Sequence, residues 1–424
     1  MHGLMLVTMK GLNSYGQYMR YRPLGSTGLV VSELGFGTIP ILKGSVPVLP
    51  NYYNLEDDEA IQLMFYAWNK GCNFFDTAIV PEYGDAEIKL GKFAKFLKRQ
   101  QLKALEERPL IIADKARFFD GSEMYHAVEI SIQNLGEQPD IYFVHQVDYE
   151  NADAVFGKHG ALDALAELKQ EGKIRFTGIA SHYYDILYRG AADERVDVLQ
   201  GSGNILERGM LERIRTEPLF SKKGLVINKV YAAGLLPKFF QEKELIAGVL
   251  SYPISTALIG IGTYEEADKA LLSGAYLHIS SGIEPNEEAD KAFLSNANLR
   301  ISSGIGTCDE TDKTFLREHA NADCMAWDKV IAELRKHFQP IPCDRCQRCR
   351  CPYGTEIHTV FRQYNYFFMG KDNWALKKLD LGIRESAAAC NQCTNPECIR
   401  QCPMGLYIPK LMQEVKKLVE IYLK

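Results

Sequence analysis

The stretch NFFDTAIVPEYGDAEIKLGKFAKFLKR (Asn73–Arg99) contains one complete unit of the pattern that decides the fold. It opens with a short aromatic run of the kind that favours a β-strand. It then passes a loop with Pro81 and Gly84 and continues into a segment whose apolar residues recur at helical spacing. We therefore expect a buried strand followed by an amphipathic helix.

The same unit recurs along the chain between about residue 30 and residue 275. Helical patterns such as those at 57–71, 85–100 and 161–173 separate short β-rich runs, and such crossover segments imply parallel pairing. The eight candidate strands are 33–38, 73–78, 110–115, 140–147, 174–180, 196–200, 224–230 and 256–262. Eight repeats predict an α/β fold of the (β/α)8 TIM barrel type. A doubly wound sheet is the alternative, but no Gly-rich dinucleotide turn follows the first strand.

Composition excludes several classes of function. The 424-residue chain has a formal net charge of −5, so it lacks the general basic field that nucleic-acid binding needs. No apolar run approaches the roughly 20 residues of a membrane span. The short apolar start is interrupted by Lys10, which argues against a signal peptide. We expect a cytoplasmic protein that binds neither nucleic acid nor membrane and whose fold begins near Met19.

A local repeat follows the eighth candidate strand. Similar segments occupy 262–283, 284–305 and 306–324, with a period of about 22 residues. We expect the first copy to be the eighth barrel helix and interpret the others as a duplication of little functional weight. Pro340 and Pro342 mark the next boundary. The predicted domains are therefore a barrel at 19–280, a helical extension and linker at 281–339, and a C-terminal domain at 340–424.

Four polar residues fall at or just beyond successive strand ends: Asp76, Tyr83, Lys115 and His145. Reactive groups of such barrels lie at the C-terminal ends of the strands. One such residue alone would more often be a helix cap or a core residue whose hydrogen bonds are all made within the fold. Four at successive strand ends favour an active site. A tyrosine whose pKa is lowered by a neighbouring ammonium group is a suitable proton donor to a carbonyl oxygen.

At these residues the sequence resembles the aldo-keto reductase family. The resemblance spans roughly residues 19–275, and the DTA…YG.AE…LG pattern carries it most specifically. The matching stretches are YRPLGSTGLVVSELGFGT (21–38), FFDTAIVPEYGDAEIKLG (74–91), the lysine of IIADKA (111–116), DIYFVHQVD (140–148) and IRFTGIASH (174–182).

This resemblance implies hydride transfer between a nicotinamide and a small aldehyde or ketone. It assigns Tyr83 as general acid/base, Lys115 and Asp76 as the residues that tune it, and His145 as the residue that orients the carbonyl. The coenzyme-binding residues that it implies are Gly37, Thr38, Ser181, His182, Gln200, Gly262 and Thr263. Many members have an asparagine where this chain has His182.

The sequence leaves the choice between NADH and NADPH open. Family members that favour NADPH bind its 2′-phosphate with Lys or Arg just after the eighth strand. This chain has Glu265 and Glu266 there, and only Thr263 and Lys269 are obvious helpers.

Eight of the eleven cysteines lie in two stretches near the C-terminus. They are Cys343, Cys346, Cys349 and Cys351, then Cys390, Cys393, Cys398 and Cys402, and a proline follows each set. Thiolates at this spacing suit zinc or iron–sulfur clusters, and the trailing Cys-Pro favours iron–sulfur. Structural zinc is the alternative. We interpret Cys72, Cys308 and Cys324 as packing residues.

The tail resembles the α-rich, two-cluster ferredoxin-like module fused to some aldo-keto reductases. That resemblance implies two [4Fe-4S] clusters, one on Cys343, Cys346, Cys349 and Cys402 and the other on Cys390, Cys393, Cys398 and Cys351. The leading hypothesis is an iron–sulfur aldo-keto reductase that exchanges electrons with a ferredoxin-like or other redox partner. The alternative is an electron-transfer subunit of a larger complex in which the barrel is a scaffold.

Overall fold

The structure is a computed structural model. It describes residues 19–271 apart from 47–48, 206 and 239. In the C-terminal segment it describes 341, 343, 348–349, 351–370, 375–376, 379, 383, 390, 392–394, 396–402 and 405–422. The second and third copies of the 22-residue repeat, and most of the first, lie outside the described residues.

Eight parallel strands close into a barrel, as the sequence predicts. They are β3 (Leu34–Gly37), β6 (Phe74–Asp76), β7 (Ile111–Ala116), β8 (Ile141–Val144), β9 (Phe176–Ala180), β10 (Val198–Ser202), β11 (Gly224–Asn228) and β12 (Thr256–Gly260). Neighbours in sequence are neighbours in the barrel, and β12 closes it by pairing with β3. Two antiparallel hairpins, β1 (Tyr21–Pro23) with β2 (Val30–Ser32) and β4 (Lys43–Val46) with β5 (Leu49–Asn54), are additional to the predicted strands.

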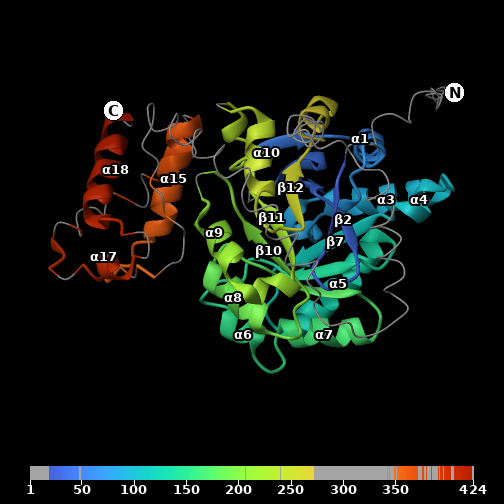
Figure 1. The fold of residues 1–424 in the computed structure, drawn as a ribbon, viewed down its shortest axis with the longest axis horizontal. Coiled ribbons are helices and arrows are strands. Elements are labelled where there is room, and N and C mark those ends of the chain that lie inside the picture. Colours follow the sequence, from blue (N-terminus) through green and yellow to red (C-terminus); the bar gives the residue numbers. More distant parts are fainter. Residues whose placement is uncertain are drawn as a thin grey trace.

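Helices surround the barrel (Figure 1). They are α1 (Asp57–Asn69), α2 (Val80–Tyr83), α3 (Ala86–Arg99), α4 (Ala104–Glu107), α5 (Gly121–Leu135), α6 (Ala152–Phe156), α7 (Ala161–Gln170), α8 (Tyr184–Ala192), α9 (Gly209–Thr216) and α10 (Glu242–Leu250). Short 3-10 helices are η2 (Ile39–Ile41), η3 (Pro218–Lys222) and η4 (Leu236–Lys238).

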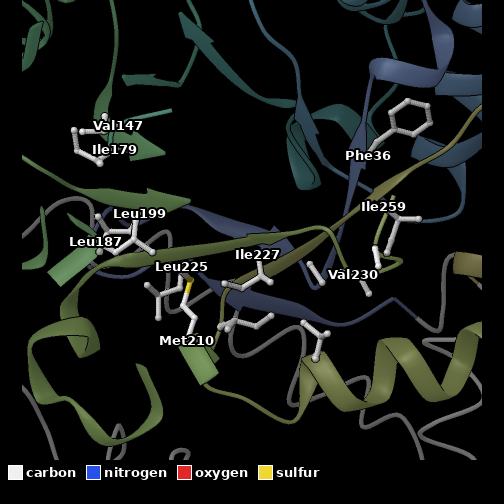
Figure 2. Close-up of a cluster of buried hydrophobic side chains, with 14 of the residues drawn as sticks. Phe36, Val147, Ile179, Leu187, Leu199, Met210, Leu225, Ile227, Val230 and Ile259 are labelled. Atoms are coloured by element: carbon white, nitrogen blue, oxygen red, sulfur yellow. The ribbon is translucent and has the colours of Figure 1, made fainter. Parts of the chain in front are cut away.

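Strand alternation divides the apolar residues into two layers. One layer fills the barrel interior and includes Phe74, Ile111, Phe143 and Val198. The other lies between the strands and the helices, where Figure 2 shows Leu187 of α8 beside Leu199 of β10. Because both faces of each strand are covered, the strands appear in the sequence as short continuous apolar runs.

The β1–β2 hairpin closes the N-terminal end of the barrel. Leu24, Leu29 and Val31 from this hairpin join the interior apolar layer. Arg22 lies beside them, and its guanidinium pairs with the fully buried Glu33 at 3.3 Å. The same guanidinium donates to the carbonyl oxygens that precede β12, those of Leu250 at 3.0 Å, Ile254 at 3.1 Å and Tyr252 at 3.5 Å.

The described part of the C-terminal segment contributes three helices, α15 (Ile357–Gly370), α17 (Glu397–Gln401) and α18 (Ile408–Tyr422), which lie together at one side of the barrel (Figure 1). Phe367 and Tyr422 pack edge to face with ring centroids 4.8 Å apart. These helices agree with an α-rich domain. Among the described residues, no helix is both long and apolar enough to cross a membrane.

The tail contacts the start of α8 and segments that follow the C-terminal ends of the barrel strands. Arg348 pairs with Asp185 at 3.0 Å, and the His358 ring packs edge to face on Tyr183 at 5.8 Å. Arg362 Nε lies 3.7 Å from Glu207 Oε1, and α15 also contacts η4. The C-terminal helices are thus placed beside the mouth at which barrel chemistry takes place.

Candidate active site

The register of the strands places polar side chains directly above the interior apolar layer. Phe74, Ala113, Phe143 and Val198 all belong to that layer. Side chains two positions apart on a strand face the same side. The residues two positions later, at the C-terminal ends, are Asp76, Lys115, His145 and Gln200. All four are less than 10% exposed.

Asp76 and Lys115 form a buried ion pair at the centre of this group. Lys115 Nζ lies 2.6 Å from Asp76 Oδ2 and also donates to the carbonyl of Thr77 at 2.6 Å. Gln200 Nε2 donates to the other carboxylate oxygen, Oδ1, at 2.7 Å. Burial tends to lower the pKa of Lys115, but Asp76, Tyr83 and Asp114 together outweigh it and hold the pKa above its ordinary value. Lys115 is therefore a charged, fixed ammonium.

Tyr83 reaches the same group from the last position of α2, which follows β6. Lys115 Nζ lies 4.8 Å from the centroid of its ring. Burial dominates and raises the pKa of Tyr83 to about 12, and the Lys115 ammonium lowers it as expected but offsets only part of the rise. The phenol is protonated at neutral pH, which suits a proton donor better than a proton acceptor.

His145 completes the predicted tetrad, with its ring edge to face on that of Tyr83 at 6.2 Å. Burial lowers the pKa of His145, although its hydrogen bond to Glu82 opposes this. The sequence analysis did not single out Glu82, whose carboxylate Oε2 is hydrogen-bonded to Nδ1 of His145 in the structure. Its position immediately before Tyr83 was the only available signal, and an acidic residue in a loop is ordinarily a solvated one.

Several residues expected to bind coenzyme lie at the same end of the barrel. Gly37 ends β3, and the Thr38 hydroxyl donates to Thr77 Oγ1 at 2.9 Å. The Ser181 hydroxyl already takes part in a local hydrogen bond, which it donates to the Val147 carbonyl at 2.6 Å. His182 beside it is half-buried. Gln200, in addition to its contact with Asp76, leaves Oε1 buried without a hydrogen-bond partner.

The turn after β12 has a feature that bears on coenzyme choice. Glu266 Oε2 accepts from the backbone amides of Gly262 and Thr263, at 2.8 and 3.1 Å. The Glu266 amide in turn donates to Thr263 Oγ1 at 3.1 Å, which completes a capping box. Lys269 pairs with Glu265 at 2.6 Å. The Glu266 carboxylate thus accepts from the two backbone amides that could otherwise donate to a bound anion.

The cysteines of the tail that the structure describes are Cys343, Cys349, Cys351, Cys390, Cys393, Cys398 and Cys402. Cys346, Cys308 and Cys324 lie outside the described residues. Burial, and then the charges of Cys351, Cys398 and Cys393, raise the pKa of Cys390 to about 11, so these four thiols lie near one another. Within the described residues, no group of three or more Cys, His, Asp or Glu side chains is arranged to hold a metal ion.

Comparison with known proteins identifies the family of the chain. A sequence model described as the Aldo/keto reductase family matches residues 33–244, which is half of the chain. This chain belongs to the aldo/keto reductase family. Family membership agrees with the closed eight-stranded barrel and with a set of buried polar residues at the C-terminal ends of its strands. It assigns the chain to a family of oxidoreductases.

Relatives within the family are distant. L-galactose dehydrogenase of Arabidopsis thaliana is 33% identical over 174 residues, which is 39% of this chain and 49% of that protein. NADH-specific methylglyoxal reductase of Escherichia coli (strain K12) is 28% identical over 228 residues, or 50% and 67% of the two chains. D-threo-aldose 1-dehydrogenase of a Pseudomonas species is 26% identical over 246 residues, or 52% and 71%.

A solved structure assigned to the aldo-keto reductases, from Pseudomonas aeruginosa, has the same fold. Its TM-score is 0.51 at 23% identity, and the match covers 63% of this chain and 99% of the other. This supports the barrel only. The chain spans about half to two thirds of the length of the first curated relatives.

Proposed function

We propose that this protein reduces a small aldehyde or ketone with a nicotinamide coenzyme, or carries out the reverse oxidation. The observation that carries the proposal is the buried Asp76–Lys115 pair beside the Tyr83 ring, at the C-terminal end of an aldo/keto reductase barrel. A reduced nicotinamide would supply the hydride to the carbonyl carbon. Tyr83 gives its proton to the carbonyl oxygen, and Lys115 stabilises the phenolate that remains.

The residues present fit a nicotinamide. Gln200 is almost fully buried, and its Oε1 has no hydrogen-bond partner. A carboxamide NH₂ is the donor that such an oxygen requires, and it would remove the cost of leaving a buried acceptor unpaired. We assign Gln200 to the carboxamide, with Ser181 and His182 beside it and Gly37 and Thr38 along the coenzyme.

We propose that NADH is the preferred coenzyme. Phosphates frequently bind the loops after the last strands of TIM barrels and nearby helix N-termini. Here Glu266 already accepts from the Gly262 and Thr263 amides. A 2′-phosphate would meet a like charge there, whereas a ribose hydroxyl can donate to a carboxylate. One of the relatives is named as NADH-specific.

The proposal is tested by following NADH and NADPH oxidation with a series of small aldehydes and ketones. We expect turnover with NADH to exceed that with NADPH. Tyr83→Phe should lower kcat by about 100-fold or more, because the proton donor is lost while the ring is kept. Tyr188→Phe is the matched control, since Tyr188 is an exposed tyrosine on α8. Unchanged carbonyl reduction in the Tyr83 variant would contradict the assignment.

We further propose that the C-terminal domain, 340–424, holds [4Fe-4S] clusters on the two cysteine sets. The mutual proximity of Cys351, Cys390, Cys393 and Cys398 supports one of the two ligand groups. The mutual repulsion of four neighbouring thiolates opposes their deprotonation, and an iron cluster would compensate that repulsion. Thiolate ligation of this kind suits the reducing conditions of the cytoplasm. The clusters would exchange electrons with a ferredoxin-like partner or another redox protein.

Anaerobic purification followed by iron and sulfide analysis tests this second proposal. Two clusters correspond to about eight iron and eight sulfide per chain. Cys398→Ser should remove about half of both, because one ligand group is broken. Cys72→Ala should remove none, since Cys72 is a fully buried residue of the barrel. Zinc without acid-labile sulfide would instead identify the alternative, a structural zinc site.

A further inference from the structure

Glu82 is held in the active site by a contact that the proposed reaction does not use. It lies on α2 immediately before Tyr83, and its carboxylate Oε2 is hydrogen-bonded to Nδ1 of His145. The two side chains are 15% and 10% exposed. The second carboxylate oxygen, Oε1, is buried and has no hydrogen-bond partner among the residues that the structure describes. Both oxygens are therefore removed from water beside the reaction centre.

This contact decides which ring nitrogen of His145 carries the hydrogen. An ionised carboxylate can only accept, so Nδ1 must be the donor. Burial lowers the pKa of His145, and the nearby Lys115 ammonium acts in the same direction, so the neutral ring carries one proton at neutral pH. That proton is on Nδ1, and Nε2 has a bare lone pair.

Nε2 of His145 is consequently a hydrogen-bond acceptor beside two donors, the Lys115 ammonium and the Tyr83 hydroxyl. No hydrogen bond in the described part of the chain uses this nitrogen. The Tyr83 ring lies edge to face with the imidazole at 6.2 Å, and Tyr83 presents a protonated hydroxyl to the same space. A neutral His145 of this tautomer cannot orient a carbonyl oxygen by donating to it from Nε2. It can receive a hydroxyl hydrogen.

We propose that Glu82 sets the substrate class by making His145 a hydrogen-bond acceptor, so that the site favours α-hydroxy aldehydes and ketones. The carbonyl oxygen accepts from Tyr83, and the hydroxyl on the neighbouring carbon donates to His145 Nε2. This inference rests on the proposed carbonyl reduction. A site built to bind a hydroxyl discriminates strongly against analogues that lack one, because its buried partner is then left unpaired.

The turnover test compares hydroxyacetone with methoxyacetone, whose methyl ether oxygen can accept but not donate. For the unmodified protein we expect kcat/KM to favour hydroxyacetone by about 10- to 100-fold. Glu82→Gln should reduce that ratio to about 1–3. The glutamine NH₂ can donate to Nδ1, and the ring then carries its hydrogen on Nε2. Glu171→Gln is the matched control: this exposed glutamate, just after α7, should leave the ratio unchanged. An unaltered ratio in a Glu82→Gln protein whose His145 carries its hydrogen on Nε2 would overturn the inference.

A second measurement tests the tautomer without any turnover. With ¹⁵N-histidine labelling, nine imidazoles are observed, and His145→Asn identifies the relevant pair of nitrogens. We expect the unmodified protein to show hydrogen on Nδ1, and Glu82→Gln to show it on Nε2. Hydrogen on Nε2 of the unmodified protein would overturn the inference and leave the proposed reductase activity standing. Failure to reduce any carbonyl would instead count against the reductase, and against the substrate class that depends on it.

Discussion

Replacing Lys115 with methionine is expected to lower the free energy of unfolding by about 3–5 kcal/mol and to reduce carbonyl turnover by about 10³-fold. Methionine fills much of the space of the lysine stem but leaves the Asp76 carboxylate without its cation. Asp76 is 4% exposed and would keep only the Gln200 donor. The loss of stability thus reflects an uncompensated buried charge, and the loss of activity reflects an unsupported Tyr83 phenolate.

The two losses can be separated by a second substitution. Asp76→Asn added to Lys115→Met removes the uncompensated charge, so denaturant unfolding should regain most of the lost stability while turnover stays low. Lys173→Met serves as the control, because Lys173 pairs with Glu129 and Glu171 near the surface and should cost less than about 1 kcal/mol. Recovery of turnover in the double variant would show that Lys115 has only a structural role.

The part of the site that the sequence could predict is the part set by strand periodicity. Asp76, Lys115 and His145 each stand two positions after an interior apolar residue, so alternation alone directs them into the mouth. The same rule separates Lys115 from its neighbour Asp114, which faces the opposite side and lies beside Glu87. Parallel closure then brings the strand ends together at one face.

The remaining features depend on three-dimensional surroundings that no spacing encodes. The sign of the Tyr83 pKa shift depends on how burial compares with the Lys115 charge, and only the packed structure supplies both quantities. The Glu82–His145 contact depends on the direction in which a four-residue helix leaves its strand. The Glu266 contact was open to prediction as a capping box, since threonine and glutamate stand three residues apart at 263 and 266.

Contacts between distant segments were likewise beyond the sequence. The cysteine spacing suggested a metal domain but gave no indication of where the tail lies. The pair Arg348–Asp185 places it at the first turn of α8, and the pair Arg362–Glu207 places it at the loop after β10. The β1–β2 hairpin was also missed, because three-residue strands leave little periodicity, although it closes the barrel and carries Arg22.

Replacing Arg22 with methionine is expected to cost about 3–5 kcal/mol of unfolding free energy with no change in turnover per folded molecule. The Arg22 guanidinium joins the hairpin to the fully buried Glu33 and to backbone carbonyls before β12. Its removal takes the paired cation away from the fully buried Glu33 carboxylate and a charged donor away from those carbonyls. Because these groups lie at the N-terminal ends of the strands, the mouth of the barrel should be unaffected.

Denaturant unfolding and active-site titration of the same preparations distinguish this prediction from a general loss of structure. Lys92→Met is the matched control: Lys92 pairs with Asp57, both side chains are 47% exposed, and the expected cost is under about 1 kcal/mol. Adding Glu33→Gln to Arg22→Met should recover part of the lost stability, because the buried charge is then removed. A fall in turnover per folded molecule would show instead that the two ends of the barrel are coupled, and that the hairpin helps to position Asp76 and Lys115.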